Sequence, residues 1–387
     1  MRILKRLTAA CLAVILMMST AACNKDLSWA MKNDDLTVPA GAYIYYMYSA
    51  YQEAASLVED SSKPVLEQQI DGKNADEWIK ETAMRYTKML LVVNDQMKEL
   101  GLSLTDEEKE AISTTTEEQW TNSSATLTKY GIAKTSFDLA YSEFYTKYQK
   151  IFNAIYGKGG SKEVSDDELK TYFNENYSNY TYIYAPLYDV DYSTYATTNF
   201  DDEKKEKIKT AMDEYVTKIN AGEMTIEEAG EAYKKLTDTT TSPLYSDAVL
   251  LSTSAGYPQS FIDAFNKLEV GKVSAVDLDS SYIIVLKRDI TAKTDEKIAD
   301  ETARAEILGN FKNQEFMDWM DQLADEYDGG TVNNDMINHY QPSMFEDPSS
   351  YVSSAASSEA AASGASSASS SASSSASSAA SSTTSSQ

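Results

Sequence analysis

The spacing of apolar residues changes twice along this chain, and these changes limit the folds that it can adopt. From residue 38 to about residue 156, apolar residues recur at three- and four-residue steps, as they do on one face of a helix. A segment rich in aromatic and β-branched residues begins at Tyr180, which favours strands. Helical spacing returns from Asp295 to about Tyr327, where we expect one long helix. The predicted order is helices, a strand-bearing segment, and helix again.

Two runs in the middle segment are typical of strands. One extends from Tyr180 to Ala185, and the other, from Tyr282 to Leu286, is continuously apolar, as expected for a strand that is covered on both faces. Helical patterns separate the two runs along the chain. We predict that the strand around Ile183 lies beside the strand around Ile283 in one small sheet.

The first residues resemble an export signal that ends in a lipid attachment site. A short basic head precedes an apolar run from Leu7 to Met18, which is too short to span a bilayer, and small residues follow directly before Cys23. This arrangement resembles the lipobox of bacterial lipoproteins, in which the cysteine receives diacylglycerol and becomes the mature N-terminus. It departs from that pattern at Thr20, where the family prefers leucine.

The signal predicts where the protein acts. We expect residues 1–22 to be removed, Cys23 to carry the lipid, and the protein to lie on the extracytoplasmic face of the cell membrane. Secretion with an unmodified thiol is the alternative. The only other cysteine, Cys11, lies inside the apolar run, so the mature chain has no internal disulfide to stabilise it.

The charge of the chain excludes several classes of partner. Sixty acidic residues against 34 basic ones give a formal net charge of −26, which disfavours nucleic acid and anionic lipid head groups. With a single histidine, His339, and a lipid-bearing cysteine, only carboxylates remain as metal ligands. No phosphate-binding or dinucleotide fingerprint appears. We therefore expect no metal and no cofactor, and we interpret His339 as a surface or packing residue.

Aromatic residues and the C-terminal end complete the sequence picture. The chain has 27 tyrosines, and those from Tyr43 to Tyr51 fall at several helix angles, so they either pack between helices or partly line a groove.

Residues 349–387 contain 21 serines and 11 alanines. Such a segment buries too little apolar surface to offset the entropy of ordering, so we expect a disordered tail, inert or serving as a spacer.

The middle segment resembles the parvulin-type peptidyl-prolyl isomerase domain. Val216 to Glu223 is similar to a helix of that family that ends in glycine. Phe261 to Ser274, followed by the strand at Tyr282, is similar to its second half, in which a phenylalanine-bearing helix leads into a Gly-x-Val-Ser turn. With helical regions on both sides, the whole arrangement resembles the PrsA- and SurA-like extracytoplasmic foldase lipoproteins.

The resemblance implies an α+β fold with a mainly helical chaperone-like domain, made of N-terminal helices and a C-terminal helix, into which a parvulin-like small-sheet domain is inserted. The predicted parts are a signal peptide at residues 1–22, a tether at 23–37, the first helical part at 38–177, the parvulin-like domain at 178–291, the C-terminal helix that completes the helical domain at 292–345, and the disordered tail at 346–387.

The active site implied by the resemblance is degenerate. Parvulin domains pair two histidines, but the last-strand histidine aligns with Tyr282, and no imidazole occurs near Tyr182 to Ala185, where the first is expected. The pocket phenylalanine corresponds to Phe261, and Tyr257 replaces the pocket methionine. We therefore name Tyr257, Phe261 and Tyr282 as the candidate proline pocket, with the catalytic residues unknown.

Loss of the imidazoles does not by itself exclude activity. Prolyl isomerisation breaks no covalent bond, and its barrier of roughly 20 kcal/mol comes from amide resonance. A catalyst needs an apolar slot for the proline ring and hydrogen bonds that favour the twisted amide. Tyrosine hydroxyls can supply such bonds, so either weak isomerase activity or binding alone is consistent with the sequence.

The sequence thus predicts a membrane-anchored extracytoplasmic foldase or chaperone for secreted proteins, with possible weak peptidyl-prolyl cis-trans isomerase activity. Its partners would be unfolded or partly folded secreted polypeptides, and the membrane through the N-terminal lipid. The alternative from another class is a non-catalytic cell-surface lipoprotein that binds a solute or a protein partner.

Overall fold

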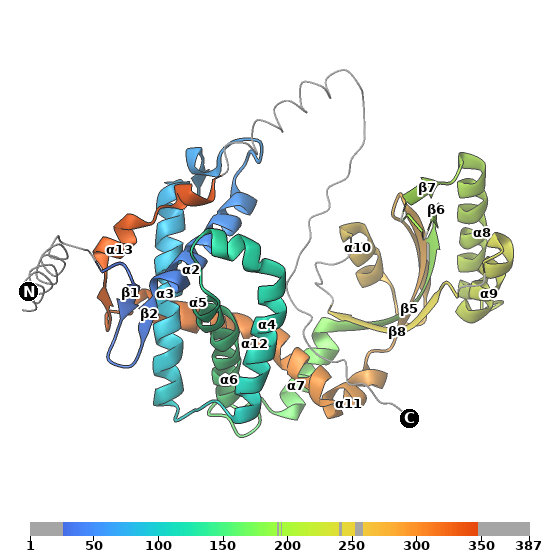
Figure 1. The fold of residues 1–387 in the computed structure, drawn as a ribbon. Helices are drawn as coiled ribbons and strands as arrows, with labels where there is room; N and C mark the ends of the chain where they lie inside the picture. The colour runs from blue at the N-terminus through green and yellow to red at the C-terminus, as the bar shows by residue number, and fades with distance from the viewer. Residues whose placement is uncertain (1–25, 192, 195, 240–241, 252–257, 347–387) are drawn as a thin grey trace, which may run out of the picture. The chain divides into compact units, whose positions relative to one another are not determined.

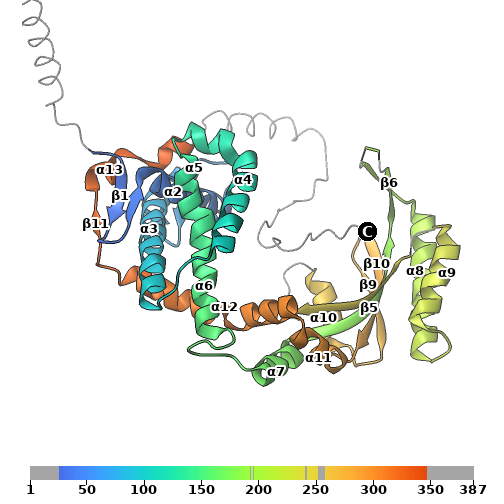
Figure 2. The ribbon, with the colours of Figure 1, turned by 60° about the horizontal axis from the view of Figure 1, so that its bottom comes forward.

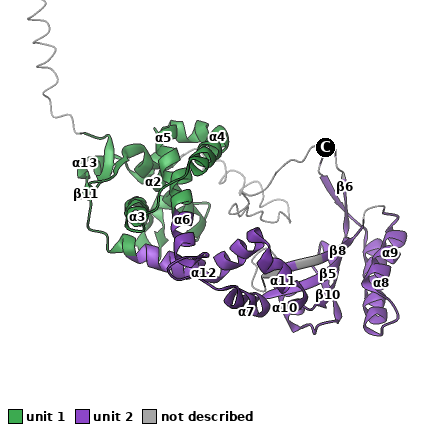
Figure 3. Cartoon of the chain, turned by 90° about the horizontal axis from the view of Figure 1, so that it is seen from below, with its two compact units in different colours: residues 1–147, 323–387 green, residues 148–322 purple. Residues whose placement is uncertain are grey.

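The computed structural model describes residues 26–191, 193–194, 196–239, 242–251 and 258–346. The chain divides into two compact units, one from Met1–Lys147 with Leu323–Gln387 and the other from Tyr148–Gln322 (Figure 3). The first unit is therefore built from both ends of the chain. The predicted signal peptide, Cys23 and the tail after Glu346 lie outside the described residues. The predicted domain limits at residues 178 and 291 stay a prediction.

The first unit is mainly helical. Its elements are β1 (Trp29–Lys32), β2 (Thr37–Pro39), α2 (Ala40–Leu57), the 3-10 helix η1 (Val65–Glu67), β3 (Gln69–Ile70), β4 (Lys73–Asn74), α3 (Ala75–Glu99), α4 (Asp106–Lys129), α5 (Lys134–Phe137), the π-helix η2 (Asp138–Glu143), the beginning of α6 (Phe144–Tyr156), the end of α12 (Glu301–Asp325), β11 (Thr331–Val332), α13 (Asn334–His339) and the 3-10 helix η3 (Pro342–Phe345).

Tyrosines of α2 belong mostly to the core of this unit. Tyr43 and Tyr51 are buried in one cluster, against which Tyr45 and Tyr48 are half-buried, and Tyr46 is buried in a second cluster. Of the two interpretations of these residues, packing between helices therefore describes them better than lining an open groove. Helix α2 is apolar on most of its circumference because neighbouring elements cover it, which is the pattern of a buried helix.

Residues near the C-terminus complete the core of the first unit. Strand β1 pairs antiparallel with both β2 and β11, giving the sheet order β11-β1-β2. Farther along, Phe345 is 6% exposed and packs against Tyr48, Tyr51 and Tyr130. Segments separated by nearly 300 residues of sequence therefore share one hydrophobic cluster, which neither end of the chain can build alone.

The second unit contains the strand-bearing segment. After the end of α6 come α7 (Asp166–Asn176), β5 (Tyr177–Pro186), β6 (Tyr188–Asp191), β7 (Ala196–Asn199), α8 (Asp202–Asn220), α9 (Ile226–Thr237), β8 (Leu244–Leu251), α10 (Gln259–Lys267), β9 (Val273–Asp277), β10 (Ser281–Arg288), α11 (Thr291–Ala299) and most of α12. Among the described residues of the whole chain, no helix is both long and apolar enough to cross a bilayer.

A four-stranded antiparallel sheet forms the centre of this unit. Its order is β8-β5-β10-β9, and β10 pairs with β5 along its length, with Ile183 opposite Ile284. The predicted pairing of the two apolar runs is confirmed. Helices α8 and α9 cover one face of the sheet and α10 covers the other (Figures 1 and 2). The predicted fold class, helices with a small parvulin-like sheet, is confirmed as well.

Three helices of the structure begin at a capping box, and one helix expected from the sequence is divided in two. Thr105, Ser165 and Thr225 each form a capping box with the glutamate three residues later, as their sequences indicate. The single helix expected from residue 295 to residue 327 is instead two helices, and that expectation was wrong. The backbone of Asp300 is extended, and its carboxylate accepts a hydrogen bond from the Ala303 amide, so Asp300 ends α11 and caps α12.

Candidate functional site

Phe261 is a residue of helix α10, and its side chain packs in the core between this helix and the sheet. Its side chain is 1% exposed, and its ring packs 6.0 Å from that of Tyr180 on β5 and 6.2 Å from that of Phe265. The same cluster contains Ile283 and Val285 of β10. The Phe261 side chain therefore packs α10 against the sheet, and almost none of its surface is exposed to a ligand.

Tyr282 lies on the opposite face of the sheet. Side chains alternate along β10, so Tyr282 and Ile284 pack with α8 and α9, whereas Ile283 and Val285 face α10. The Tyr282 hydroxyl donates a 2.6 Å hydrogen bond to Asp213 on α8, and burial, together with this carboxylate, raises its pKa. The structure does not bring Tyr282 and Phe261 together. Tyr257 lies outside the described residues.

Different side chains occupy the α10 side at this end of the sheet. Ser281, one residue before Tyr282, is 3% exposed and hydrogen-bonds Tyr184 of β5. The Tyr184 hydroxyl also lies 3.3 Å from the hydroxyl of Tyr188 on β6. Three hydroxyl groups from three strands thus form one connected network, and they do so near the strand position where the sequence alignment expected a histidine.

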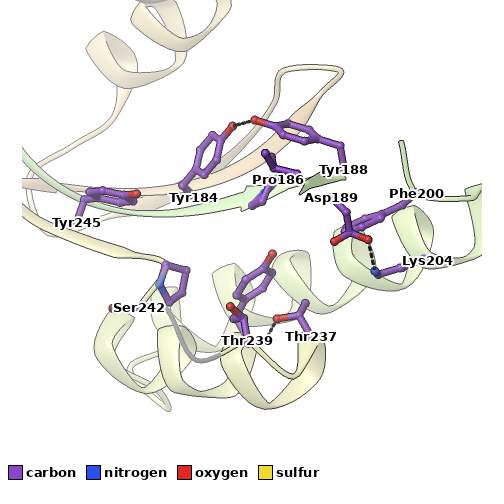
Figure 4. A pocket seen from close by; sticks show the side chains of 13 residues that line it. Tyr184, Pro186, Tyr188, Asp189, Phe200, Lys204, Thr237, Thr239, Ser242 and Tyr245 are labelled. Atoms are coloured by element: carbon purple, nitrogen blue, oxygen red, sulfur yellow. Dashed lines mark hydrogen bonds and ion pairs between the residues drawn. The ribbon is translucent and has the colours of Figure 1, made fainter. Parts of the chain in front are cut away.

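This network borders a cleft of about 430 Å³ at the end of β5 (Figure 4). Figure 4 shows the Tyr184 and Tyr188 rings meeting through their hydroxyls on one side of the strand, with Ser242, Thr237 and Thr239 on the other side. The cleft is lined by aromatic, proline and hydroxyl-bearing side chains together with one ion pair: Tyr184, Pro186, Tyr188, Asp189, Val190, Phe200, Lys204, Tyr233, Thr237, Thr239, Ser242, Pro243 and Tyr245.

An aromatic strip extends along β5 from the buried cluster to the cleft. Tyr180 is fully buried, Tyr182 and Tyr184 are half-buried, and Tyr245 of β8 is 48% exposed. The rings of Tyr182 and Tyr245 stack at 4.7 Å with an interplanar angle of 8°. Rings of this kind offer apolar area to a ligand at little cost in side-chain entropy.

Two tyrosine hydroxyls at the cleft, those of Tyr184 and Tyr233, stay protonated near neutral pH. Burial raises the pKa of Tyr184 and of Tyr233 to about 12, so both hydroxyls keep their protons and can donate hydrogen bonds. Among the lining residues only Asp189 is acidic, and its carboxylate lies 3.8 Å from the ammonium group of Lys204. Within the described residues, no cluster of three or more metal-ligating side chains occurs.

The raised tyrosine pKa values predict how stability depends on pH. The pKa of both groups is about 12 in the folded domain against 10.0 ordinarily, so folding favours the neutral form. This contribution is complete below pH 10 and is lost as the pH rises towards 12. We expect the urea midpoint of the domain to fall over this interval, and Tyr233→Phe to flatten the fall. A midpoint that stays constant up to pH 12 would contradict the burial of these hydroxyls.

The sequence of the strand-bearing domain shows the family to which this domain belongs. Residues 164–304 match the family described as the PPIC-type PPIASE domain. These residues form a parvulin-type domain. The match begins just before α7 and contains the whole four-stranded sheet, so the strand pairing and the family assignment agree. No curated protein matches the chain.

Several solved structures are similar to the chain, with low sequence identity. The foldase protein PrsA of Lactococcus lactis is 15% identical, with a TM-score of 0.34 and coverage of 84% of this chain and 98% of the other. PrsA of Streptococcus pneumoniae is 15% identical, with a TM-score of 0.33 and coverage of 70% and 98%. PrsA of Bacillus subtilis is 16% identical, with a TM-score of 0.21 and coverage of 65% and 89%.

The parvulin-type domain contains no histidine. His339, the only histidine of the sequence, lies in α13 of the other unit, beyond the matched residues. Sequence reasoning missed the network of Ser281, Tyr184 and Tyr188. The tyrosines at alternate positions of β5 indicated a shared face, but nothing in the continuous apolar run of β10 showed that Ser281, not Tyr282, lies on that face.

Proposed function

We propose that the protein is a foldase for exported polypeptides that binds unfolded segments without a cofactor. The observation that carries this proposal is the aromatic, hydroxyl-lined cleft of a parvulin-type domain, next to the partly exposed strip of Tyr182 and Tyr245. Apolar rings with hydroxyl groups suit contact with chains of varied sequence, because they combine burial with adaptable hydrogen bonding. Isomerase activity is expected to be weak, since no imidazole is present in the domain.

The proposed location follows from the sequence. The export signal and Cys23 support anchoring by an N-terminal lipid on the extracytoplasmic face of the membrane, which would place the domain where exported chains emerge unfolded. The acidic surface of the chain, with its net charge of −26, would keep the tethered protein soluble and favour basic over acidic clients. Metabolic labelling with a fatty acid tests the anchor, because Cys23→Ala should abolish incorporation.

Two assays on the purified protein test the proposed activity. The first follows aggregation of an unfolded client after dilution from denaturant, and we expect suppression at near-equimolar protein. Tyr245→Ala should weaken suppression, because it removes an exposed ring from the strip, whereas Val270→Ala removes a 59% exposed side chain elsewhere in the domain and should not. The second assay follows cis-trans exchange of a proline-containing peptide.

Each result separates this proposal from its alternative. An aggregation curve that the protein leaves unchanged, together with saturable binding of a folded partner or a solute, would favour the non-catalytic cell-surface lipoprotein. Suppression of aggregation without peptide isomerisation would support a binding-only foldase and remove the enzymatic half of the proposal.

A further inference from the structure

We propose that the cleft at the end of β5, and not a pocket around Phe261 and Tyr282, receives the prolyl segment, with the Tyr184 hydroxyl donating a hydrogen bond to the prolyl nitrogen as the peptide bond twists. The inference rests on the proposed foldase function and assigns its substrate contact. It gives Tyr184 a catalytic role and gives Ser281 and Tyr188 positioning roles.

Exposure favours the cleft over the pocket that the sequence indicated. Phe261 is 1% exposed and Tyr282 is 8% exposed, and they belong to clusters on opposite faces of the sheet. Phe261 cannot touch a peptide without opening the core, and the Tyr282 hydroxyl is already bonded to Asp213 on the other face of the sheet. Tyr184, in contrast, is half-buried and lines an open cleft of about 430 Å³, a volume within the usual range of ligand pockets.

The hydroxyl network orients the Tyr184 group. Tyr184 is hydrogen-bonded to the buried Ser281 on β10, and its hydroxyl lies 3.3 Å from that of Tyr188 on β6. Either tyrosine can be the donor of the pair, and in the arrangement in which Tyr188 donates, the Tyr184 proton is left for a ligand in the cleft. Ser281 is 3% exposed and is the first residue of β10, so this side of the network is buried.

A donor at this place favours the twisted amide over the planar one. In the planar prolyl bond the nitrogen lone pair is delocalised into the carbonyl group and accepts no hydrogen bond. Twisting localises the lone pair on nitrogen, which then becomes an acceptor. A hydroxyl aimed at nitrogen therefore stabilises the transition state and not the ground state, and no bond is made or broken.

The remaining lining residues define the segment that fits. Pro186 and Pro243, which lie next to Tyr184 along the cleft, supply apolar contacts for a proline ring. The single lining carboxylate, Asp189, is paired with Lys204, whose ammonium group also lies 3.3 Å from the centroid of the Phe200 ring. The cleft thus presents no uncompensated charge. We infer that it takes neutral X-Pro segments and does not require a charged residue before the proline.

The test measures cis-trans exchange of proline tetrapeptides by the full chain and its variants. Tyr184→Phe removes the donor and keeps the ring, and we expect kcat/KM to fall about fivefold to tenfold, mainly through kcat, as for the loss of one hydrogen bond. Ser281→Ala should reduce it less, because it acts through Tyr184. Tyr215→Phe removes a half-buried hydroxyl of α8 outside the cleft and serves as the matched control, with an unchanged rate expected.

Two further readouts separate a direct role from a structural one. The wild-type rate should be constant from pH 6 to pH 9, because the tyrosine donor does not titrate there, whereas an imidazole would. We expect the wild-type protein to act on peptides with alanine, glutamate or lysine before proline with kcat/KM values within about threefold of one another. The charges lining the cleft compensate each other, so only screened long-range charge effects remain.

Several outcomes would overturn the inference. Unchanged kinetics in Tyr184→Phe would do so, as would a loss confined to Tyr282→Phe, which would restore the sequence-indicated pocket. If the wild-type protein suppresses aggregation but accelerates no peptide, the foldase proposal survives and the catalytic assignment of Tyr184 fails. If it does neither, both fail.

Discussion

Replacing Phe261 with alanine is expected to destabilise the parvulin-type domain by about 3–5 kcal/mol, the usual cost of removing a buried phenylalanine. The side chain is 1% exposed and packs against Tyr180 and Phe265, so its loss leaves a cavity between α10 and the sheet. A small domain is stabilised by only about 5–15 kcal/mol, so this change removes a large fraction of the total.

The measurement is hydrogen exchange of segments of the full chain, which reports the two units separately. Protection of β5 and β10 should fall in Phe261→Ala, while protection of α2 and α3 in the other unit should not change. Val270→Ala, a truncation at a 59% exposed position of the same domain, should change stability by less than about 0.5 kcal/mol. Full protection of the sheet combined with lost isomerisation would instead make Phe261 a ligand contact.

The second large effect is expected at the other end of the chain. Phe345→Ala should destabilise the helical unit by about 3–5 kcal/mol. Phe345 is 6% exposed, its ring lies 4.9 Å from that of Tyr130 in an edge-to-face arrangement, and it also contacts Tyr48 and Tyr51 of α2. Edge-to-face pairs of this kind add to the free energy of burial.

Exchange protection of α2 and thermal unfolding of the whole chain would measure this effect. The matched control is a chain that stops after Glu346, which keeps Phe345 and the 3.1 Å hydrogen bond from the Leu66 amide to the Glu346 carboxylate. This control should unfold like the full chain. If Phe345→Ala left α2 fully protected, the C-terminal segment would not be part of the core of this unit.

Much of the fold was predictable because local signals agreed with tertiary packing. Thr105, Ser165 and Thr225 each precede a glutamate at the correct spacing, and each starts a helix. The apolar run after Tyr282 has the composition of a central strand, and it is one. Strand β8 was harder to find, because Leu244 to Leu251 places serine and aspartate in its centre, which hides its periodicity.

The candidate site was less predictable, for a physical reason. A strand covered on both faces shows no alternation of polar and apolar residues, so the sequence of β10 does not reveal which residues face α10. Aligning Tyr282 with a histidine therefore put it on the wrong side of the sheet for a partner of Phe261. The cleft is also lined by Tyr188, Phe200 and Thr239, which come together through the packing of β6, α8 and α9 between β5 and β8.

The division of the chain into one continuous and one discontinuous unit also fixes an order of assembly in a chain that emerges from the proposed export channel with its N-terminus first. Residues 148–322 are contiguous, so every strand of the parvulin-type sheet emerges before β11 and Phe345 do. Since domains fold as units as the chain lengthens, the inserted domain reaches its native state first. The surrounding helical unit, although it supplies the N-terminal residues, is the last part to close.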